Sequence, residues 1–321
     1  MGAGSVHIQM VDSSSKNRKT STKCEDAVTV PITVAASTAA EAFLSAWSSL
    51  SEDELKPPIT CKQALPEVSS LDAVFDIHAA MQVSQQGLER FQGVGGWKLG
   101  WKNNPLLKEK SLPAMYSPIF RGTFVPSGSD VDLSRSKVFC IEAEYGFTIG
   151  ERITPRQQPY TESEVWALVS KVELCIELCG VRALLPDASP YHFLADAMLN
   201  AGVVRGPVLT PDLIPDPAAL ADIDVTVRVN SVEFNSGSGR ENPLDSPLAS
   251  LTFLVNDLAC RRGLAIEPDM LVIAGHTVQL GFAGRPRPHS APPLTCASIT
   301  DGDLLEADFK GLGIVTAVLR S

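Results

Sequence analysis

The sequence predicts an α+β fold in which a small helical region precedes a larger region built mainly from strands. Between residues 34 and 94 apolar residues recur with the helical period, whereas from residue 95 onward several apolar runs alternate with the period of two typical of strands. A chain of 321 residues is long enough for one large domain and a small one. We therefore expect a helical region over residues 34–94 and a large strand-rich domain over residues 95–321.

Charge and hydropathy exclude two classes of partner. The net charge is −10, which is the opposite of the basic surface that nucleic acids require. No apolar run reaches the roughly 18 residues that a membrane helix needs. Seven cysteines form neither a zinc-type pair of CxxC motifs nor an even disulfide framework, which is typical of an intracellular protein.

Residues 1–33 are rich in serine, lysine, threonine and valine and show no clear periodicity, so we expect a disordered extension. A mitochondrial presequence would be rich in arginine and poor in acidic residues, but this stretch contains one arginine and three acids. The sequence therefore predicts a cytoplasmic location, with the mitochondrion as the alternative.

Two helices are expected in the region before residue 95. The first begins near Ser37, and the second follows Ser70, a residue type that commonly caps a helix. Their apolar stripes consist of Ala40, Phe43, Leu44 and Trp47 in the first helix and Val74, Ile77 and Met81 in the second.

Lys98 interrupts an apolar, strand-like run that glycines bracket, Gly95-Gly96-Trp97-Lys98-Leu99-Gly100. A lysine buried between tryptophan and leucine is either paired with a carboxylate or tuned for chemistry. A surface lysine that extends into solvent is the alternative.

The run KVFCIEAEYGFTIG, residues 137–150, has an apolar face and a polar face when it is interpreted as a strand. Glu142 and Glu144 fall on the polar face, about 7 Å apart along the strand. A second run, residues 172–179, places Glu173, Cys175 and Glu177 on one face. Carboxylates clustered on otherwise apolar strands suit a hard divalent cation such as Mg²⁺ or Mn²⁺. The alternative is an edge strand whose polar face is solvated. Cys175 and Cys179, which alternate with these carboxylates, are expected to be small buried fillers.

Two short helices are expected in the middle of the chain. The capping box Thr161–Glu164 starts a helix that we expect to run to about Lys171. Ser189-Pro190 starts another, which places His192 and Asp196 four residues apart on one helix face.

The second half of the chain is strand-rich. Residues 223–229 alternate cleanly, and residues 235–239 then form a glycine-rich loop whose amides could face a carboxylate or phosphate, although a plain hairpin loop has the same composition. A helix follows Ser246-Pro247 and ends at Gly263. Further strands are expected over residues 270–274, 304–309 and 314–319, and a loop over residues 284–293.

The order of these motifs resembles one family. The motifs follow one another along the chain as GWKLG, the EAE strand, ELCGVR, LADAMLNAG, NSGSG, SPLASL, LVIAG and DFKGLGIV. Together they resemble the 2-keto-4-pentenoate hydratases, which are the hydratase/decarboxylase branch of the fumarylacetoacetate hydrolase superfamily. The resemblance covers roughly residues 38–320. It implies that the strands form a large mixed, strongly curved β-sheet roll and that the chain assembles into at least a dimer.

The resemblance also implies roles for individual residues. The family binds Mg²⁺ or Mn²⁺ through an ExE pair and a later glutamate, which match Glu142, Glu144 and Glu177 here. The catalytic lysine falls on Lys98, and the aspartate of a helix motif falls on Asp196. The loop whose amides could bind the substrate carboxylate matches Ser236, Gly237, Ser238 and Gly239.

Three positions depart from the family. Met115 stands where an acidic residue is usual, Ala197 replaces the asparagine that follows the motif aspartate, and Ala274-Gly275 replaces a threonine–glycine strand end. These changes predict either a substrate different from the family's or an activity that is reduced or lost.

The implied activity is that of a metal-dependent lyase, which adds water to a small 2-hydroxydienoate or decarboxylates a related 2-oxo acid. The cation would stabilise the enolate, and Lys98, its pKa lowered by the cation and by burial, would move protons. Two alternatives remain open. A hydrolase that cleaves acylpyruvates would need a general base for water, usually an early His–Glu pair that this sequence lacks. A non-catalytic relative would bind a small oxo acid or a partner.

Overall fold

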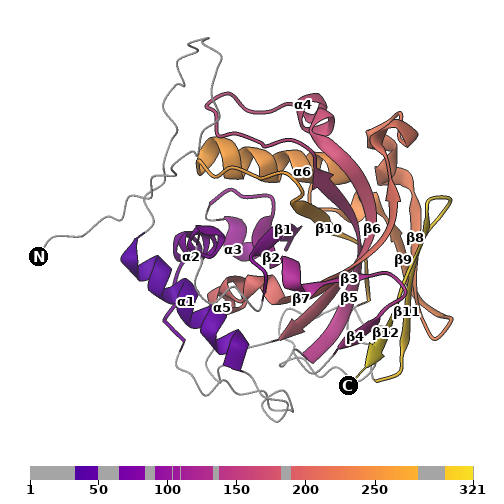
Figure 1. Cartoon of the computed structure of the whole chain (residues 1–321). Helices are drawn as coiled ribbons and strands as arrows, with labels where there is room; N and C mark the ends of the chain where they lie inside the picture. The colour runs from indigo at the N-terminus through magenta and orange to yellow at the C-terminus, as the bar shows by residue number, and fades with distance from the viewer. Residues whose placement is uncertain are drawn as a thin grey trace, which may run out of the picture.

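Two β-sheets and a small group of helices make up the fold, which confirms the α+β class (Figure 1). The computed structural model describes residues 33–49, 65–83, 91–102, 104–108, 110–132, 137–181, 189–280 and 301–320. All of the predicted extension except Thr33, and the predicted loop 284–293, lie outside these ranges. In the described part of the chain, no helix is long and apolar enough to cross a membrane.

The two N-terminal helices are present, and they pack on each other. They are α1 (Val34–Ser49) and α2 (Leu71–Val83). The Ser70 hydroxyl accepts a hydrogen bond from the Ala73 amide at 3.2 Å, which satisfies one of the free amides at the start of α2. Helix α2 also packs on α5 (Pro190–Ala195) and on strand β2, so this helical group covers one end of the large sheet (Figure 1).

The larger sheet is mixed and has seven strands, in the order β2-β1-β10-β5-β6-β7-β3. Strand β1 runs parallel to β10 and β3 runs parallel to β7, while the other neighbours are antiparallel. The strands are β1 (Val94–Gly100), β2 (Met115–Phe120), β3 (Phe124–Pro126), β5 (Lys137–Ile149), β6 (Val169–Val181), β7 (Asn200–Leu209) and β10 (Leu271–Leu280).

This sheet is strongly curved. Ile119 on β2 shares a buried cluster with Cys175 on β6 and Val203 on β7, although β2 and β7 lie near opposite ends of the strand order. Side chains from such distant strands can meet only if the sheet curls so that its two ends approach each other. The predicted mixed, curved sheet is therefore confirmed, and its inner face collects residues from β1, β2, β5, β6 and β7.

A second sheet packs on the outer face of the first. It has five strands, and its β11 and β12 contact β6. The Tyr145 ring on β5 meets the Phe309 ring edge-on at a centroid distance of 5.2 Å, while Phe147 meets Trp166. The apolar face of β5 is thus used for packing, and its polar face points inward. The strands are β4 (Asp130–Asp132), β8 (Asp224–Val229), β9 (Val232–Ser238), β11 (Leu304–Phe309) and β12 (Gly313–Arg320).

Helix α6 (Pro247–Val255) packs on β10, as predicted after Ser246, and a π-helical segment continues it to Arg261. The remaining helical segments are short: α3 (Pro105–Lys108), α4 (Glu162–Ala167) and 3₁₀ turns at Arg121–Thr123, Ala197–Leu199, Pro211–Leu213, Pro217–Asp222 and Gly239–Glu241.

Two predicted helices end earlier than expected. The capping box of α4 is present, but the helix stops at Ala167, and residues 169–171 belong to β6, where Val169 pairs with Ile149. Helix α5 stops at Ala195, so Asp196 is a non-helical cap. The His192 ring contacts Ser189 and the Pro66 carbonyl, and the Asp196 amide donates to the His192 carbonyl at 2.8 Å as the helix ends. Sheet pairing and a tight turn override the local helical pattern.

The predicted glycine-rich loop is also wrong in part. Ser236, Gly237 and Ser238 belong to β9, an edge strand paired with β8, and only Gly239 lies beyond it, in a 3₁₀ turn. Ser236 pairs with Thr226 and Gly237 with Val225. Because β8 supplies backbone partners along this run, the run extends as a strand despite its glycine.

Candidate metal centre

Three carboxylates converge on the inner face of the curved sheet. Glu142 on β5 lies directly opposite Glu177 on β6, and Glu144 lies two residues farther along β5, so all three side chains point to the same side. One carboxylate oxygen from each lies within 4.8 Å of the other two. The side chains are 8%, 0% and 0% exposed for Glu142, Glu144 and Glu177.

The arrangement fits a divalent cation. Glu144 Oε1 and Glu177 Oε2 are buried and accept no hydrogen bond from any described residue. Buried polar atoms of this kind are rare unless a ligand, water or ion satisfies them. The three carboxylates and Lys98 together carry a charge of −2 when all are ionised, which one divalent cation would neutralise. The donor set consists of oxygens, as Mg²⁺ and Mn²⁺ prefer.

Lys98 reaches this group from across the curved interior. Strands β1 and β6 are not neighbours in the sheet, yet Lys98 Nζ lies 2.5 Å from Glu177 Oε1 and donates to the Met198 carbonyl at 3.4 Å. Burial acts to lower the pKa of Lys98, but the negative groups around it, Glu177 first, outweigh burial and raise the pKa. The expected lowering of the Lys98 pKa is therefore wrong for the protein groups alone, and a bound cation would add to the lowering effect of burial.

Two further groups, which the sequence did not indicate, orient the carboxylates. The Asn200 side-chain amide donates to Glu177 Oε1 at 2.8 Å, and the Gly275 amide donates to Glu144 Oε2 at 2.9 Å. Gly275 lies at a bulge in β10 with φ of +95°, a backbone conformation that favours glycine. The glycine of the predicted strand end thus aims an amide at a candidate ligand.

Glu173 shares the inner face but is already paired. Arg205 donates to its two oxygens at 2.7 and 2.5 Å, and the Thr148 hydroxyl also bonds to it. Burial acts to raise the pKa of Glu173, but the Arg205 and Thr148 hydrogen bonds outweigh burial and lower it. Both oxygens of Glu173 accept hydrogen bonds from Arg205, so this carboxylate has a structural role on the inner face.

Strand β2 contributes a hydroxyl that the sequence did not single out. Ser117 lies directly opposite Lys98, fully buried, and its Oγ has no hydrogen-bond partner among the described residues. Met115, the departure from the family pattern, is two residues away and therefore on the same face. Met115 is apolar where the resemblance predicts an acidic residue, while the nearby Ser117 hydroxyl is available to a bound molecule.

The segment that follows Asp196 is strained. Ala197, Met198 and Leu199 have φ of 48°, 50° and 65°, a left-handed conformation that non-glycine residues seldom adopt. Asp196 is buried and lies two residues before Met198, whose carbonyl accepts from Lys98. Strain of this kind is characteristic of functional sites. The catalytic role of Asp196 stays a prediction, as does substrate binding by Ser236–Gly239.

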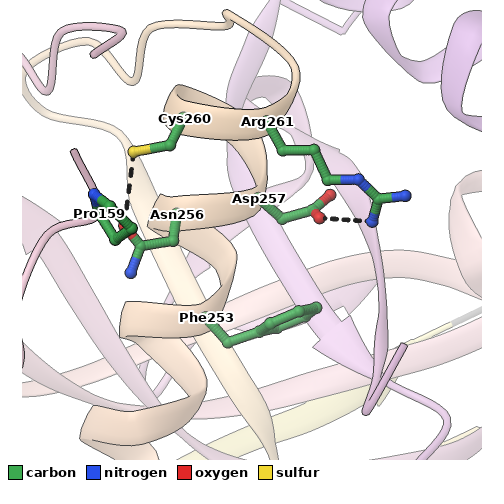
Figure 2. Close-up of a pocket in the computed structure, with 6 residues that line it drawn as sticks. All are labelled: Pro159, Phe253, Asn256, Asp257, Cys260 and Arg261. Atoms are coloured by element: carbon green, nitrogen blue, oxygen red, sulfur yellow. Dashed lines mark hydrogen bonds and ion pairs between the residues drawn. The ribbon is translucent and has the colours of Figure 1, made fainter. Parts of the chain in front are cut away.

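A surface pocket at the end of α6 shares no residue with this site. Figure 2 shows Pro159, Phe253, Asn256, Asp257, Cys260 and Arg261 around it. Asp257 bonds to Arg261 at 3.0 Å, and it also bonds to Arg262 and to the Tyr116 hydroxyl. The carboxylate therefore ties the helix to β2 and is not available to a ligand.

Comparison with solved structures identifies the fold. The 4-oxalocrotonate decarboxylase from Pseudomonas putida G7, complexed with magnesium and adipate, superposes with a TM-score of 0.65 at 18% identity, over 89% of this chain and 97% of that one. The same enzyme complexed with calcium and acetate gives 0.65 at 18%, over 88% and 96%. A fumarylacetoacetate hydrolase from Exiguobacterium antarcticum gives 0.50 at 18%, over 71% and 75%.

No protein-family model matches the sequence, and no curated protein sequence matches it either. At 18% identity the structural likeness shows a shared fold, which is the fold of enzymes in the fumarylacetoacetate hydrolase superfamily. The hydratase branch within that superfamily stays a prediction.

Proposed function

We propose that this protein is a divalent-metal-dependent lyase that decarboxylates, or adds water to, a small 2-oxo or 2-hydroxydienoic acid. The observation that carries the proposal is the buried group of three carboxylates with Lys98 bound to Glu177. Glu144 and Glu177 each have one oxygen that no described residue hydrogen-bonds. The decarboxylase that shares the fold was solved with magnesium and an organic acid, which supports this class of ligand.

Glu142, Glu144 and Glu177 would hold Mg²⁺ or Mn²⁺. When bound, the cation supplies positive charge that stabilises the negative charge developing on the oxygens of a 2-oxo acid. Asn200 and the Gly275 amide keep Glu177 and Glu144 in place.

Lys98 is the group that would move protons. Its ammonium is buried and held by Glu177 and the Met198 carbonyl, so its position does not depend on solvent. From Nζ a proton can pass to a substrate carbon when the enol form becomes the ketone. The buried Ser117 hydroxyl opposite Lys98 can hydrogen-bond to the same substrate.

Two further parts of the chain would take part at this site. Asp196 would assist Lys98 in proton transfer, and the amides of Ser236–Gly239 would bind the substrate carboxylate. We also propose that the protein acts as a homo-oligomer of at least two chains.

A turnover assay tests the proposal. The protein, with Mg²⁺ or Mn²⁺, is given 2-hydroxypenta-2,4-dienoate, oxaloacetate and an acylpyruvate in parallel, with chelator as the blank. We expect metal-dependent turnover of one of the first two. Cleavage of the acylpyruvate alone would make the protein a C–C bond hydrolase. Binding of Mn²⁺ without turnover of any of the three would make it a non-catalytic relative.

A further inference from the structure

Two cysteines lie opposite each other next to the three carboxylates. Cys140 on β5 pairs with Cys179 on β6, two residues along each strand from the pair formed by Glu142 and Glu177. Residues paired in this way, and residues two apart on one strand, point to the same face. The thiols therefore belong to the inner face, at the side of the carboxylates away from Glu144.

The two thiols and one carboxylate form a second compact group. Cys140 Sγ, Cys179 Sγ and one oxygen of Glu142 all lie within 4.8 Å of one another. All three side chains are buried, and Glu142 and Cys179 keep 8% and 7% of their surface exposed. The two thiols and the carboxylate thus lie in a largely enclosed part of the inner face.

We propose that Cys140, Cys179 and Glu142 form a second cation site, which takes a thiophilic divalent ion of the zinc type. Sulfur ligands favour Zn²⁺ and Cd²⁺, whereas Mg²⁺ and Mn²⁺ favour oxygen. Each thiol gives its proton to solvent on binding, so two thiolates and one carboxylate face a charge of +2. Three protein ligands leave a fourth position for water, as in zinc sites that are open on one side.

The second site is coupled to the first because Glu142 belongs to both groups. A carboxylate that is shared between two cations is a weaker ligand to each of them, and two divalent cations at adjacent sites repel each other. We therefore expect a zinc-type ion at the thiols to weaken the binding of Mn²⁺ by the carboxylates. The inference does not depend on the reaction that the protein catalyses, since its readout is metal binding.

Cadmium titration of the reduced full-length protein tests the site, because cadmium bound to thiolates has a charge-transfer absorption in the ultraviolet. We expect this absorption to saturate at one Cd²⁺ per chain. Cys140→Ser and Cys179→Ser should each remove it and weaken Cd²⁺ binding by at least about tenfold. Cys175→Ser is the matched control, since Cys175 is buried on the same face of β6 but lies outside the group. It should keep the absorption.

Folding of each variant is checked by its Mn²⁺ affinity, which the carboxylate site supplies. Absorption that survives in Cys140→Ser and Cys179→Ser, or that disappears equally in Cys175→Ser, would overturn the proposal. The wild-type protein alone provides an independent test of the sulfur ligands. The ¹¹³Cd resonance of a site with two sulfur ligands differs from that of an all-oxygen site. Only an all-oxygen resonance would likewise overturn it.

Discussion

At the scale of single residues, Glu142 and Glu173 are both buried carboxylates on the inner face, but their neighbours differ. Glu142 is one of the three carboxylates of the candidate metal centre, whereas Glu173 is hydrogen-bonded to Arg205 and Thr148. Glu142→Gln removes one negative ligand and keeps its shape. We expect Mn²⁺ affinity, measured by isothermal titration, to fall by about 10–100-fold or more.

Glu173→Gln is the matched control for that experiment. It weakens the contact with Arg205, so the free energy of unfolding should decrease while Mn²⁺ affinity stays close to that of the wild type. Equal Mn²⁺ binding by the wild type and Glu142→Gln would contradict the metal centre.

Lys98 neutralises part of the charge of Glu177 in the buried interior. Lys98→Met keeps most of the stem but leaves the carboxylates without their cationic partner. Breaking a buried ion pair costs roughly 3–5 kcal/mol of stability. We expect the thermal midpoint to drop without cation and to recover largely when Mn²⁺ is added, while turnover falls by about two to four orders of magnitude.

Lys102→Met is the comparison variant for Lys98→Met. Lys102 forms an ion pair of the same length with Asp245, but that pair lies at the surface. Exposed pairs contribute less than about 1 kcal/mol, so this variant should show neither the loss nor the recovery. If Mn²⁺ does not stabilise the Lys98→Met protein, the idea that Lys98 and the cation both neutralise the three carboxylates would be contradicted.

Ser117 has a fully buried hydroxyl without a hydrogen-bond partner among the described residues. A buried unpaired hydroxyl costs stability, so Ser117→Ala should raise the free energy of unfolding by up to about 1–3 kcal/mol. If the hydroxyl bonds to substrate, KM should rise by about threefold to tenfold. Denaturant unfolding and steady-state kinetics measure the two effects. A loss of stability would instead indicate a structural role.

At the scale of elements, the contact between β1 and β10 depends on a glycine. A Cβ added at Gly96 would lie 1.8 Å from the Leu271 carbonyl oxygen, so Gly96→Ala must push the two strands apart. We expect a loss of at least about 4 kcal/mol of stability, or failure to fold. Gly100→Ala, on the same strand, meets only the flexible end of Met198 at 3.2 Å and should be tolerated. Thermal melts compare the two variants, and similar midpoints would contradict the packing of β1.

At the scale of the whole molecule, the carboxylate group links stability to pH and metal. Burial first, and then Glu177 and Glu142, raise the pKa of Glu144 well above its ordinary value. A folded-state pKa above the unfolded one means that, without cation, stability falls as pH rises from about 4.3 toward the raised value. A cation binds the deprotonated form and offsets this loss.

Thermal melts between about pH 5 and about pH 8 test this linkage, with Mn²⁺ or with chelator. We expect the Mn²⁺-dependent increase in midpoint to grow with pH. An increase that is constant over this range, or larger at the acidic end, would show that Glu144 does not bind the ion.

The sequence by itself determined the class of fold and the two strand faces that carry the carboxylates. A period of two is a local property of an extended chain, so Glu142, Glu144 and Glu177 could be assigned to polar faces without knowledge of the partner strands. The extents of α4 and β9 could not be predicted in this way, because pairing with neighbouring strands overrode the local helix and glycine signals.

Only the tertiary structure decided how these faces form one site. The curl of the sheet brings Lys98 on β1 to Glu177 on β6, and the bulge at Gly275 aims an amide at Glu144. It also places Cys140 beside Cys179, a residue that the sequence indicated only as a small buried filler. These contacts join residues that lie far apart along the chain. They depend on strand order, register and curvature, which no local pattern of residues specifies.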